Sequence, residues 1–275
     1  MVIDGTCFDV PDSDENAKVF GRPGTRPGFS AAFPKVRLVI LIESGTHLIF
    51  DALMCPYRMG ERVRALKLLR SVKSGMLLMW DRGLHSYGMV QATVVKGCDY
   101  LGRIPANVKF LVEKPLADGS YLSLIYPSGK LRKKGCQPLQ VRVIEYTIEH
   151  PEQPQEQLTY RLITSLLDIQ QFPAQLLASE YHQRWEVENT IDELKIHLLG
   201  RKTPVRSQNP REVVQEVYGW LLGHWAVRLL MFHAASEASV APLRLSFTGT
   251  LRVIRRALPK FQRLQMEELP LFSVG

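Results

Sequence analysis

The sequence predicts an α/β protein whose mixed sheet is flanked by helices and carries a β-rich insertion. Three observations lead to this fold class. Strand-length apolar runs recur through the first hundred residues, separated by a stretch whose apolar side chains have helical spacing. Short strand-like runs and turn dipeptides then fill residues 101–158. A long stretch without Pro or Gly follows at 174–199, and its composition favours a helix.

The first hundred residues are expected to form the first half of the core. Residues 1–10, 36–43 and 47–57 have strand character and predict an antiparallel meander of three strands, with a Gly- and Pro-rich loop at 11–34. A helix is expected over 60–73, where apolar residues recur every three positions. A strand at 76–80 and a helix at about 85–95 complete this half.

The β-rich insertion is assigned to residues 101–158, with strands expected at 108–112, 121–126 and 139–148. Eight basic and two acidic residues lie between 101 and 142, a local surplus of six in a chain with a formal net charge of +8. The densest basic run is Lys130, Arg132, Lys133 and Lys134. A solvated hairpin tip explains this run, and so does a surface that faces phosphates, which the overall charge favours.

The chain after the insertion is expected to return to the core over residues 159–240 and to end in a helical tail, residues 241–275. It begins with a strand at 160–167. After Pro173 comes the long helix, and residues 213–235 form a second, apolar helix. The tail includes a helical segment at 245–256 with a cationic polar face.

Four side chains of the long helix share one face. Tyr181, Arg184, Glu188 and Lys195 fall within an arc of roughly 60° on an α-helix. A carboxylate between two cations and a phenol suits a metal-bound phosphodiester, because the carboxylate holds the cation and the bases hold phosphate oxygens. An exposed face of ion pairs is the alternative interpretation. Glu186 and Glu193 point away from this face and are expected to be solvated.

Two further acids stand out. Asp4 lies inside an apolar run, where a carboxylate is costly unless it has a partner or a metal ion. Asp81 follows the strand at 76–80, a position where open α/β sheets often place their chemistry. Asp81 could instead cap the segment that follows it.

These blocks together resemble the IS-four family of bacterial DDE transposases. The spacing Y-x2-R-x3-E-x6-K in the long helix is similar to the family's signature helix. Asp4-Gly5-Thr6 resembles its first acidic block, Asp81-Arg82-Gly83 its second, and Leu245-Ser246-Phe247-Thr248 its C-terminal segment. The resemblance implies a ribonuclease-H-like sheet with the insertion between the second and third catalytic acids.

The resemblance also implies a mechanism. Asp4, Asp81 and Glu188 would hold two Mg²⁺ ions, with Mn²⁺ as a substitute, for phosphodiester hydrolysis and strand transfer at insertion-sequence ends. Cut-and-paste transposition through a DNA hairpin is expected. Tyr181, Arg184 and Lys195 would grip the transposon end. Tyr160 is a candidate to stack on a flipped base.

The expected partners are duplex DNA, both transposon ends and target, and a second copy in a synaptic complex. A pI near 9.4 fits a polyanionic partner. No apolar run is long enough to cross a membrane, and cytoplasmic location at the nucleoid is expected. Only three residues precede Asp4, whereas the family carries a DNA-binding region there, so we expect a catalytic domain that lacks this region. A truncated, non-catalytic DNA-binding remnant is the alternative.

Overall fold

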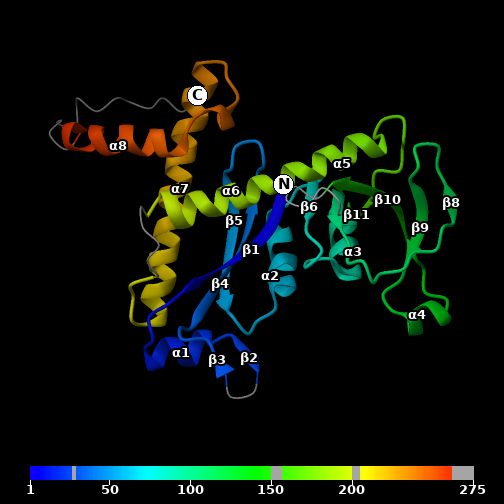
Figure 1. The fold of residues 1–275 in the computed structure, drawn as a ribbon, viewed down its shortest axis with the longest axis horizontal. Coiled ribbons are helices and arrows are strands. Elements are labelled where there is room, and N and C mark those ends of the chain that lie inside the picture. The colour runs from blue at the N-terminus through cyan, green and yellow to red at the C-terminus, as the bar shows by residue number, and fades with distance from the viewer. Residues whose placement is uncertain (27–28, 150–156, 200–204, 262–275) are drawn as a thin grey trace.

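A single nine-stranded mixed sheet organises the chain in the computed structural model, which describes residues 1–26, 29–149, 157–199 and 205–261. The strand order is β5-β4-β1-β6-β7-β11-β10-β9-β8 (Figure 1). Helices cover both faces. None of the described helices is long and apolar enough to cross a bilayer.

The first half of the sheet is built around β1 (Val2–Asp9). It pairs antiparallel with β4 (Lys35–Ile42), which pairs antiparallel with β5 (Ile49–Pro56), so the predicted meander is confirmed. On its other side β1 runs parallel to β6 (Leu77–Trp80), and β6 runs parallel to β7 (Asp99–Arg103). The carboxyl ends of β1 and β6 therefore point the same way.

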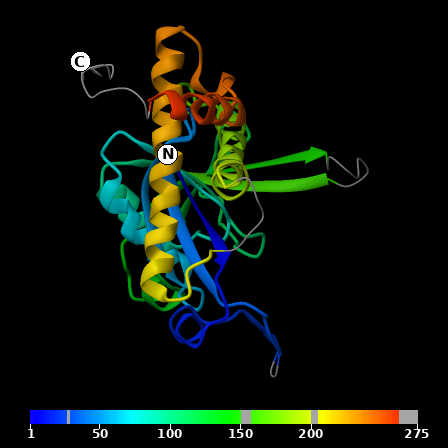
Figure 2. The same ribbon diagram turned by 90° about the vertical axis from the view of Figure 1, so that its left-hand side faces the viewer.

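The second half continues the same sheet with antiparallel strands. β11 (Gln157–Thr164) pairs with β7, and β10 (Leu139–Glu149), β9 (Tyr121–Ile125) and β8 (Lys114–Pro115) follow outward. Figure 2 shows β10 and β11 projecting beyond the neighbouring strands. The strands of the β-rich insertion thus extend the core sheet.

Two strand assignments need correction. Residues 108–112 form no strand, because this apolar run lies at the surface, where Leu111 is 57% exposed. The core strand β7 was not predicted, because its short run contains a glycine and a charged residue at each end. Gly102 is required there, since a Cβ atom would lie 2.3 Å from Nε1 of Trp80 on the adjacent strand.

The stretch 11–34, predicted as a loop, contains α1 (Asp14–Phe20) and the small hairpin β2 (Gly24–Arg26) and β3 (Phe29–Ser30). Helix α1 forms because Ser13 caps it, accepting a 3.2 Å hydrogen bond from the amide of Asn16. The Gly residues that suggested a loop begin only after its last turn.

Two predicted helices of the first half are confirmed. They are α2 (Glu61–Leu68), which continues as a 3₁₀ turn, and α3 (Tyr87–Val95). In the insertion, the expected hairpin tip is the short helix α4 (Gly129–Lys133). Its N-terminus is capped by Ser128, whose Oγ accepts from the amide of Leu131 at 3.2 Å.

The long helix predicted over 174–199 is present as one rod with changing pitch. It comprises α5 (Ala174–His182), a 3₁₀ turn (Gln183–Trp185), α6 (Glu186–Asp192) and a π turn (Glu193–His197). It crosses over the strands in Figure 1. Helix α7 (Pro210–Glu237), a 3₁₀ turn (Pro242–Arg244) and α8 (Phe247–Phe261) complete the described chain.

Two hydrophobic clusters occupy the two faces of the sheet. One unites β1 side chains such as Val2 and Phe8 with α5, α6 and α7. The other unites Ile3 with α2 and α3. Because side chains alternate along a strand, Asp4 and Thr6 share the face of Val2 and Phe8 and lie under the long helix.

Candidate active site

Asp4 lies in the middle of β1 with its side chain 22% exposed. Its Oδ1 accepts a 2.8 Å hydrogen bond from the amide of Gly5, and its Oδ2 accepts from Nη1 of Arg184 at 3.2 Å. Burial raises the pKa of Asp4 to about 6, against the lowering effect of these two donors, and the charges of Asp81 and Glu61 add to the rise. The site therefore concentrates negative charge around a carboxylate with little access to water.

Asp81 follows the last residue of β6, as predicted. Its Oδ1 accepts from the amide of Gly83 at 2.8 Å and holds the Asp-Arg-Gly turn. Asp81 thus caps the turn that follows it, as the alternative interpretation held, whereas α3 is capped by Ser86, whose Oγ accepts from the amide of Met89 at 3.1 Å. The negative charge of Asp81 also contributes to the raised pKa of Asp4.

Glu188 projects from α6 with half of its side chain exposed. Its Oε1 lies 3.6 Å from Nη2 of Arg184, the arginine that also binds Asp4. The buried guanidinium of Arg184 thus stands between two of the three predicted acids. Within the described residues, no three His, Cys, Asp or Glu side chains are grouped so as to hold a metal ion.

The donor chemistry of the site nevertheless fits a hard divalent cation. The three predicted ligands are carboxylates, and oxygen ligands are those that Mg²⁺ prefers. The raised pKa of Asp4 shows that its negative charge is only partly compensated by Arg184, and a cation at the carboxylates would compensate it further.

Glu61 is a fourth carboxylate of this region that the sequence analysis missed. It begins α2 on the other face of the sheet, directly behind Gly5, where a Cβ atom would lie 2.3 Å from its Oε1. Burial raises the pKa of Glu61, and Asp81 raises it further, whereas Arg37, 3.0 Å from Oε2, lowers it. Asp4 is therefore followed by glycine because a larger side chain would displace this carboxylate. A lone Glu after Gly60 carries no sequence signal of that contact.

The two other signature residues reach the strands beneath the helix. Tyr181 is buried, its hydroxyl donates to the carbonyl of Trp80 at 3.4 Å, and burial raises its pKa to about 12. Nζ of Lys195 donates to Oγ1 of Thr6 and to the carbonyl of Cys7, both at 3.1 Å. The long helix thus contacts β1 and β6 directly beside Asp4 and Asp81.

Tyr160 lies in β11 with 5% of its surface exposed. Its ring stacks on Tyr146 of β10 at a centroid distance of 5.4 Å, and the guanidinium of Arg103 on β7 lies 4.0 Å from its centroid. β10 and β7 flank β11 on opposite sides, so the ring is enclosed between them. This placement leaves no room for a stacked base.

The basic residues of the insertion lie in α4 and at its end, and all four are exposed: Lys130, Arg132, Lys133 and Lys134. Figure 1 places α4 at the far end of the molecule from α6. A second set of basic residues follows the long helix at positions 201, 202, 206 and 211. Arg206 and Arg211 are exposed, whereas residues 201 and 202 lie outside the described residues.

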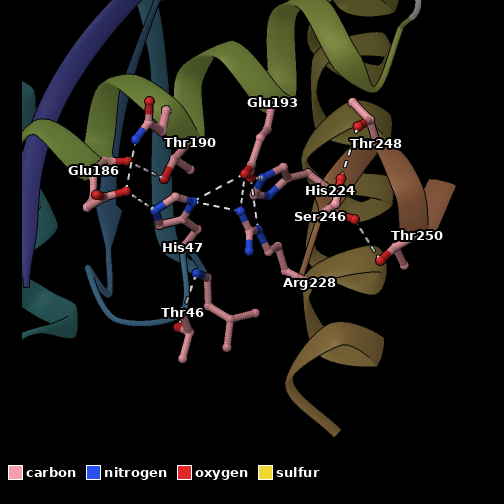
Figure 3. A network of polar contacts seen from close by, with 12 residues as sticks. Thr46, His47, Glu186, Thr190, Glu193, His224, Arg228, Ser246, Thr248 and Thr250 are labelled. Carbon is pink, nitrogen blue, oxygen red and sulfur yellow. Dashed lines mark hydrogen bonds and ion pairs between the residues drawn. The ribbon is translucent and has the colours of Figure 1, made fainter. Parts of the chain in front are cut away.

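Glu193 corrects another expectation. On a regular α-helix it points away from the site, as does Glu186, and both were interpreted as solvated. Instead Glu193 is 7% exposed and contacts Arg228 and two histidines (Figure 3). Glu186 is half-buried, and its Oε2 lies 2.8 Å from Nε2 of His47. The 3₁₀ and π turns change the rotation of the helix, and α7 covers the side on which Glu193 lies.

Comparison with known proteins adds independent findings. Residues 1–222 match the family described as the transposase DDE domain. The chain is 27% identical over 276 residues to the transposase InsG for insertion sequence element IS4 of Escherichia coli K12, covering 98% of this chain and 61% of that protein. It is 31% identical over 106 residues to the putative transposase InsZ of the same organism, covering 38% of this chain and 36% of that protein. The chain thus spans about three fifths of the length of InsG.

Among solved structures, the chain resembles the piggyBac transposase in a synaptic complex with hairpin DNA. The TM-score is 0.52 at 12% identity, and the match covers all of this chain and 58% of the other. At this identity the likeness concerns the fold alone. The fold is ribonuclease-H-like, as the family resemblance implied.

Proposed function

The chain belongs to the transposase DDE domain family, and on this premise we propose that it cleaves and joins DNA strands at insertion-sequence ends with divalent metal ions. One observation carries the proposal. Arg184 binds Asp4 at 3.2 Å and approaches Glu188 at 3.6 Å, while Asp81 lies near enough to raise the pKa of Asp4. These contacts support a shared site for acids that three elements far apart in sequence supply.

Asp4, Asp81 and Glu188 are the proposed ligands of two Mg²⁺ ions, for which Mn²⁺ would substitute. Such ions activate a water nucleophile and stabilise the leaving oxygen of a phosphodiester. The protein's part is to hold the carboxylates in place. Gly5 donates to Asp4 and Gly83 donates to Asp81, so each acid keeps a fixed orientation.

The basic signature residues are proposed to bind phosphate oxygens of the transposon end. Arg184 has planar donors that suit a phosphate as well as a carboxylate. Were Asp4 and Glu188 to hold metal ions, the donors of Arg184 would be available to bind the DNA. Lys195 contacts Thr6, which follows Asp4 by two residues in β1. Its ammonium group is therefore placed to bind a phosphate next to the one at Asp4.

Tyr181 holds the long helix against β6, because its buried hydroxyl donates to the carbonyl of Trp80, the residue before Asp81. For Tyr160 we propose a structural role, packing between β10 and β7, in place of base stacking, since Tyr146 and Arg103 enclose its ring. A hairpin intermediate remains part of the proposal, with its stacking residue unassigned.

The DNA duplex is proposed to extend from the acids toward the insertion, where the basic side chains of α4 would contact its backbone. Two copies would bring two ends together in a synaptic complex. The second candidate function is DNA binding without catalysis. It is favoured by the absence, among the described residues, of three ligand side chains already grouped for a metal ion.

A nicking assay on a supercoiled plasmid carrying the terminal repeats that flank this gene separates the two functions. Nicking that requires Mg²⁺, stops with a chelator and is abolished in Asp81→Asn supports catalysis. DNA binding with no nicking in Mg²⁺ or Mn²⁺, at protein concentrations that saturate the plasmid, would instead show a binding protein. The repeat-free plasmid is the control for end specificity.

A further inference from the structure

A buried ion cluster lies beside the proposed active site but is not part of it. We name it the Glu193 cluster, and it comprises Glu193, His47, His224 and Arg228 (Figure 3). Nε of Arg228 donates to Oε2 of Glu193 at 2.8 Å, and Nη2 of Arg228 contacts Oε1. The ring of His224 lies 3.1 Å from Oε2 and that of His47 lies 3.3 Å from Oε1. These contacts hold the pKa of Glu193 at about 2 despite the opposing effect of burial.

The cluster joins parts of the chain that are remote in sequence. His47 comes from the connection between β4 and β5, whereas His224 and Arg228 come from α7. Phe247, at the start of α8, lies over the cluster, with its ring 5.4 Å from the guanidinium of Arg228 and 5.3 Å from the ring of His224. The Leu-Ser-Phe-Thr segment therefore has a structural role as the cover of this cluster.

Glu193 is also the first residue of the π turn. Its carbonyl accepts a 2.8 Å hydrogen bond from the amide of Leu198, five residues later. Such turns are uncommon, and they re-aim the side chains that follow them. Lys195 lies inside this turn and reaches Thr6 and Cys7 on the strand that carries Asp4. The cluster thus fixes the helix between two signature residues, Glu188 and Lys195.

Two observations indicate that the π turn would rearrange without the contacts of Glu193. His47 has a backbone φ of 59°, in the left-handed region that residues other than glycine seldom adopt. A cavity of about 450 Å³, lined by Glu193, Asp192 and His197 among others, adjoins the turn. The turn therefore has space in which to rearrange, and the ion contacts of Glu193 oppose such movement.

We propose that the Glu193 cluster is a positioning device that holds the π turn and thereby aims Lys195 at the DNA phosphate beside Asp4. The inference rests on the proposed function, because it assigns Lys195 to phosphate binding. It adds a role for four buried residues that touch neither DNA nor metal in that function. Buried ion groups add little net stability compared with apolar side chains, so fixing a geometry is a reasonable use for one.

The test is a double-mutant cycle between Glu193→Gln and Lys195→Ala, with single-turnover nicking and DNA affinity as the two readouts. Rates are normalised to the folded fraction measured by near-ultraviolet circular dichroism. We expect Glu193→Gln to reduce the rate and the affinity at least tenfold when Lys195 is present, and less than twofold when it is absent. The ratio of these two effects is a coupling of at least about fivefold, which corresponds to about 1 kcal/mol. Asp192→Asn, an exposed change on the same helix, is the matched control and should leave both readouts within twofold.

Equal effects of Glu193→Gln in both backgrounds would overturn the proposal, because they would show a general structural role. If Glu193→Gln does not fold, Arg228→Lys takes its place in the same cycle. That variant keeps the charge but cannot bind Glu193 at two points, and the same pattern is expected. Absence of nicking in the unmodified chain would contradict the proposed function, and the affinity cycle would still decide the positioning role.

Discussion

The guanidinium of Arg184 binds the carboxylate of Asp4 at 3.2 Å although the two residues stand 180 positions apart in the chain. The same guanidinium lies 3.6 Å from Glu188, one helical turn away. The signature face of the long helix is thus partly an ion-paired face, as the alternative interpretation held. This face is not a solvated row of ion pairs, because Arg184 is buried and its partner Asp4 lies on the inner strand β1.

Removing any one of the three acids should abolish catalysis without abolishing binding. We expect Asp4→Asn, Asp81→Asn and Glu188→Gln each to lower the nicking rate by about 10³-fold, since metal ions contribute several kcal/mol to such reactions. DNA affinity should change by less than threefold in electrophoretic mobility shifts. Asp192→Asn serves as the control. Residual nicking above a tenth of normal in any of the three variants would remove that acid from the proposed set.

The ionised carboxylate of Asp4 should lower the free energy of unfolding of the metal-free protein. Its pKa is raised from an ordinary value of 3.8 to about 6, so the folded chain binds this proton more tightly than the unfolded chain. Stability therefore falls as pH rises from about 4 to 6, and the decrease is complete above that range. Asp4→Asn should then raise the free energy of unfolding at pH 7.5 by up to about 3 kcal/mol, with no gain at pH 3.

Urea denaturation in the presence of a chelator measures this difference. Added Mg²⁺ should narrow the gap, because it binds and stabilises the folded protein with Asp4 more than the variant. A variant that is less stable at pH 7.5 would show that the Arg184 contact outweighs the burial of Asp4.

The basic residues of the insertion should contribute by binding DNA phosphates. Neutralising Lys130, Arg132, Lys133 and Lys134 to Gln should flatten the plot of log affinity against log salt by about 0.9 for each phosphate that is no longer bound. All four side chains are exposed, so folding should be unaffected. Changing the exposed Lys67, Lys73 and Lys96 on or beside α2 and α3 provides a charge control. Similar slopes in the two variants would mean that the α4 residues are only a solvated surface.

The Glu193 cluster should make the protein sensitive to acid. Because the pKa of Glu193 is lowered from 4.5 to about 2, its contribution to stability is present above pH 4.5 and disappears as pH falls toward 2. Glu193→Gln should therefore be less stable than the unmodified chain at pH 7, and the difference should shrink across this interval. Thermal unfolding from pH 7 to pH 2.5 measures it. A pH-independent difference would indicate that the hydrogen bonds of Glu193, and not its charge, support the cluster.

Much of the fold followed from local patterns. Apolar runs predicted β1, β4, β5 and β6, and the Pro- and Gly-free stretch predicted the long helix, because strand and helix periodicities are written over a few adjacent residues. The three acidic blocks were recognisable for a related reason, because each is defined by nearby residues. A glycine follows Asp4 and Asp81 closely, and Glu188 has a fixed helical spacing to its neighbours. Asp4-Gly5 is such a pair, although the sequence did not reveal that Glu61 is what makes the glycine necessary.

Only the tertiary structure decided which charged groups become buried and what they contact. Glu193 and Glu186 look alike in the sequence, yet α7 covers Glu193 and brings Arg228 to it from 35 residues away. Tyr160 is an aromatic candidate in sequence, but its neighbours on β7 and β10 enclose it. The pitch of the helix between Glu188 and Lys195 is likewise set by packing against α7 and the connection after β4. Burial and ion pairing depend on long-range packing, which no short stretch of sequence encodes, whereas periodicity and turn chemistry are local.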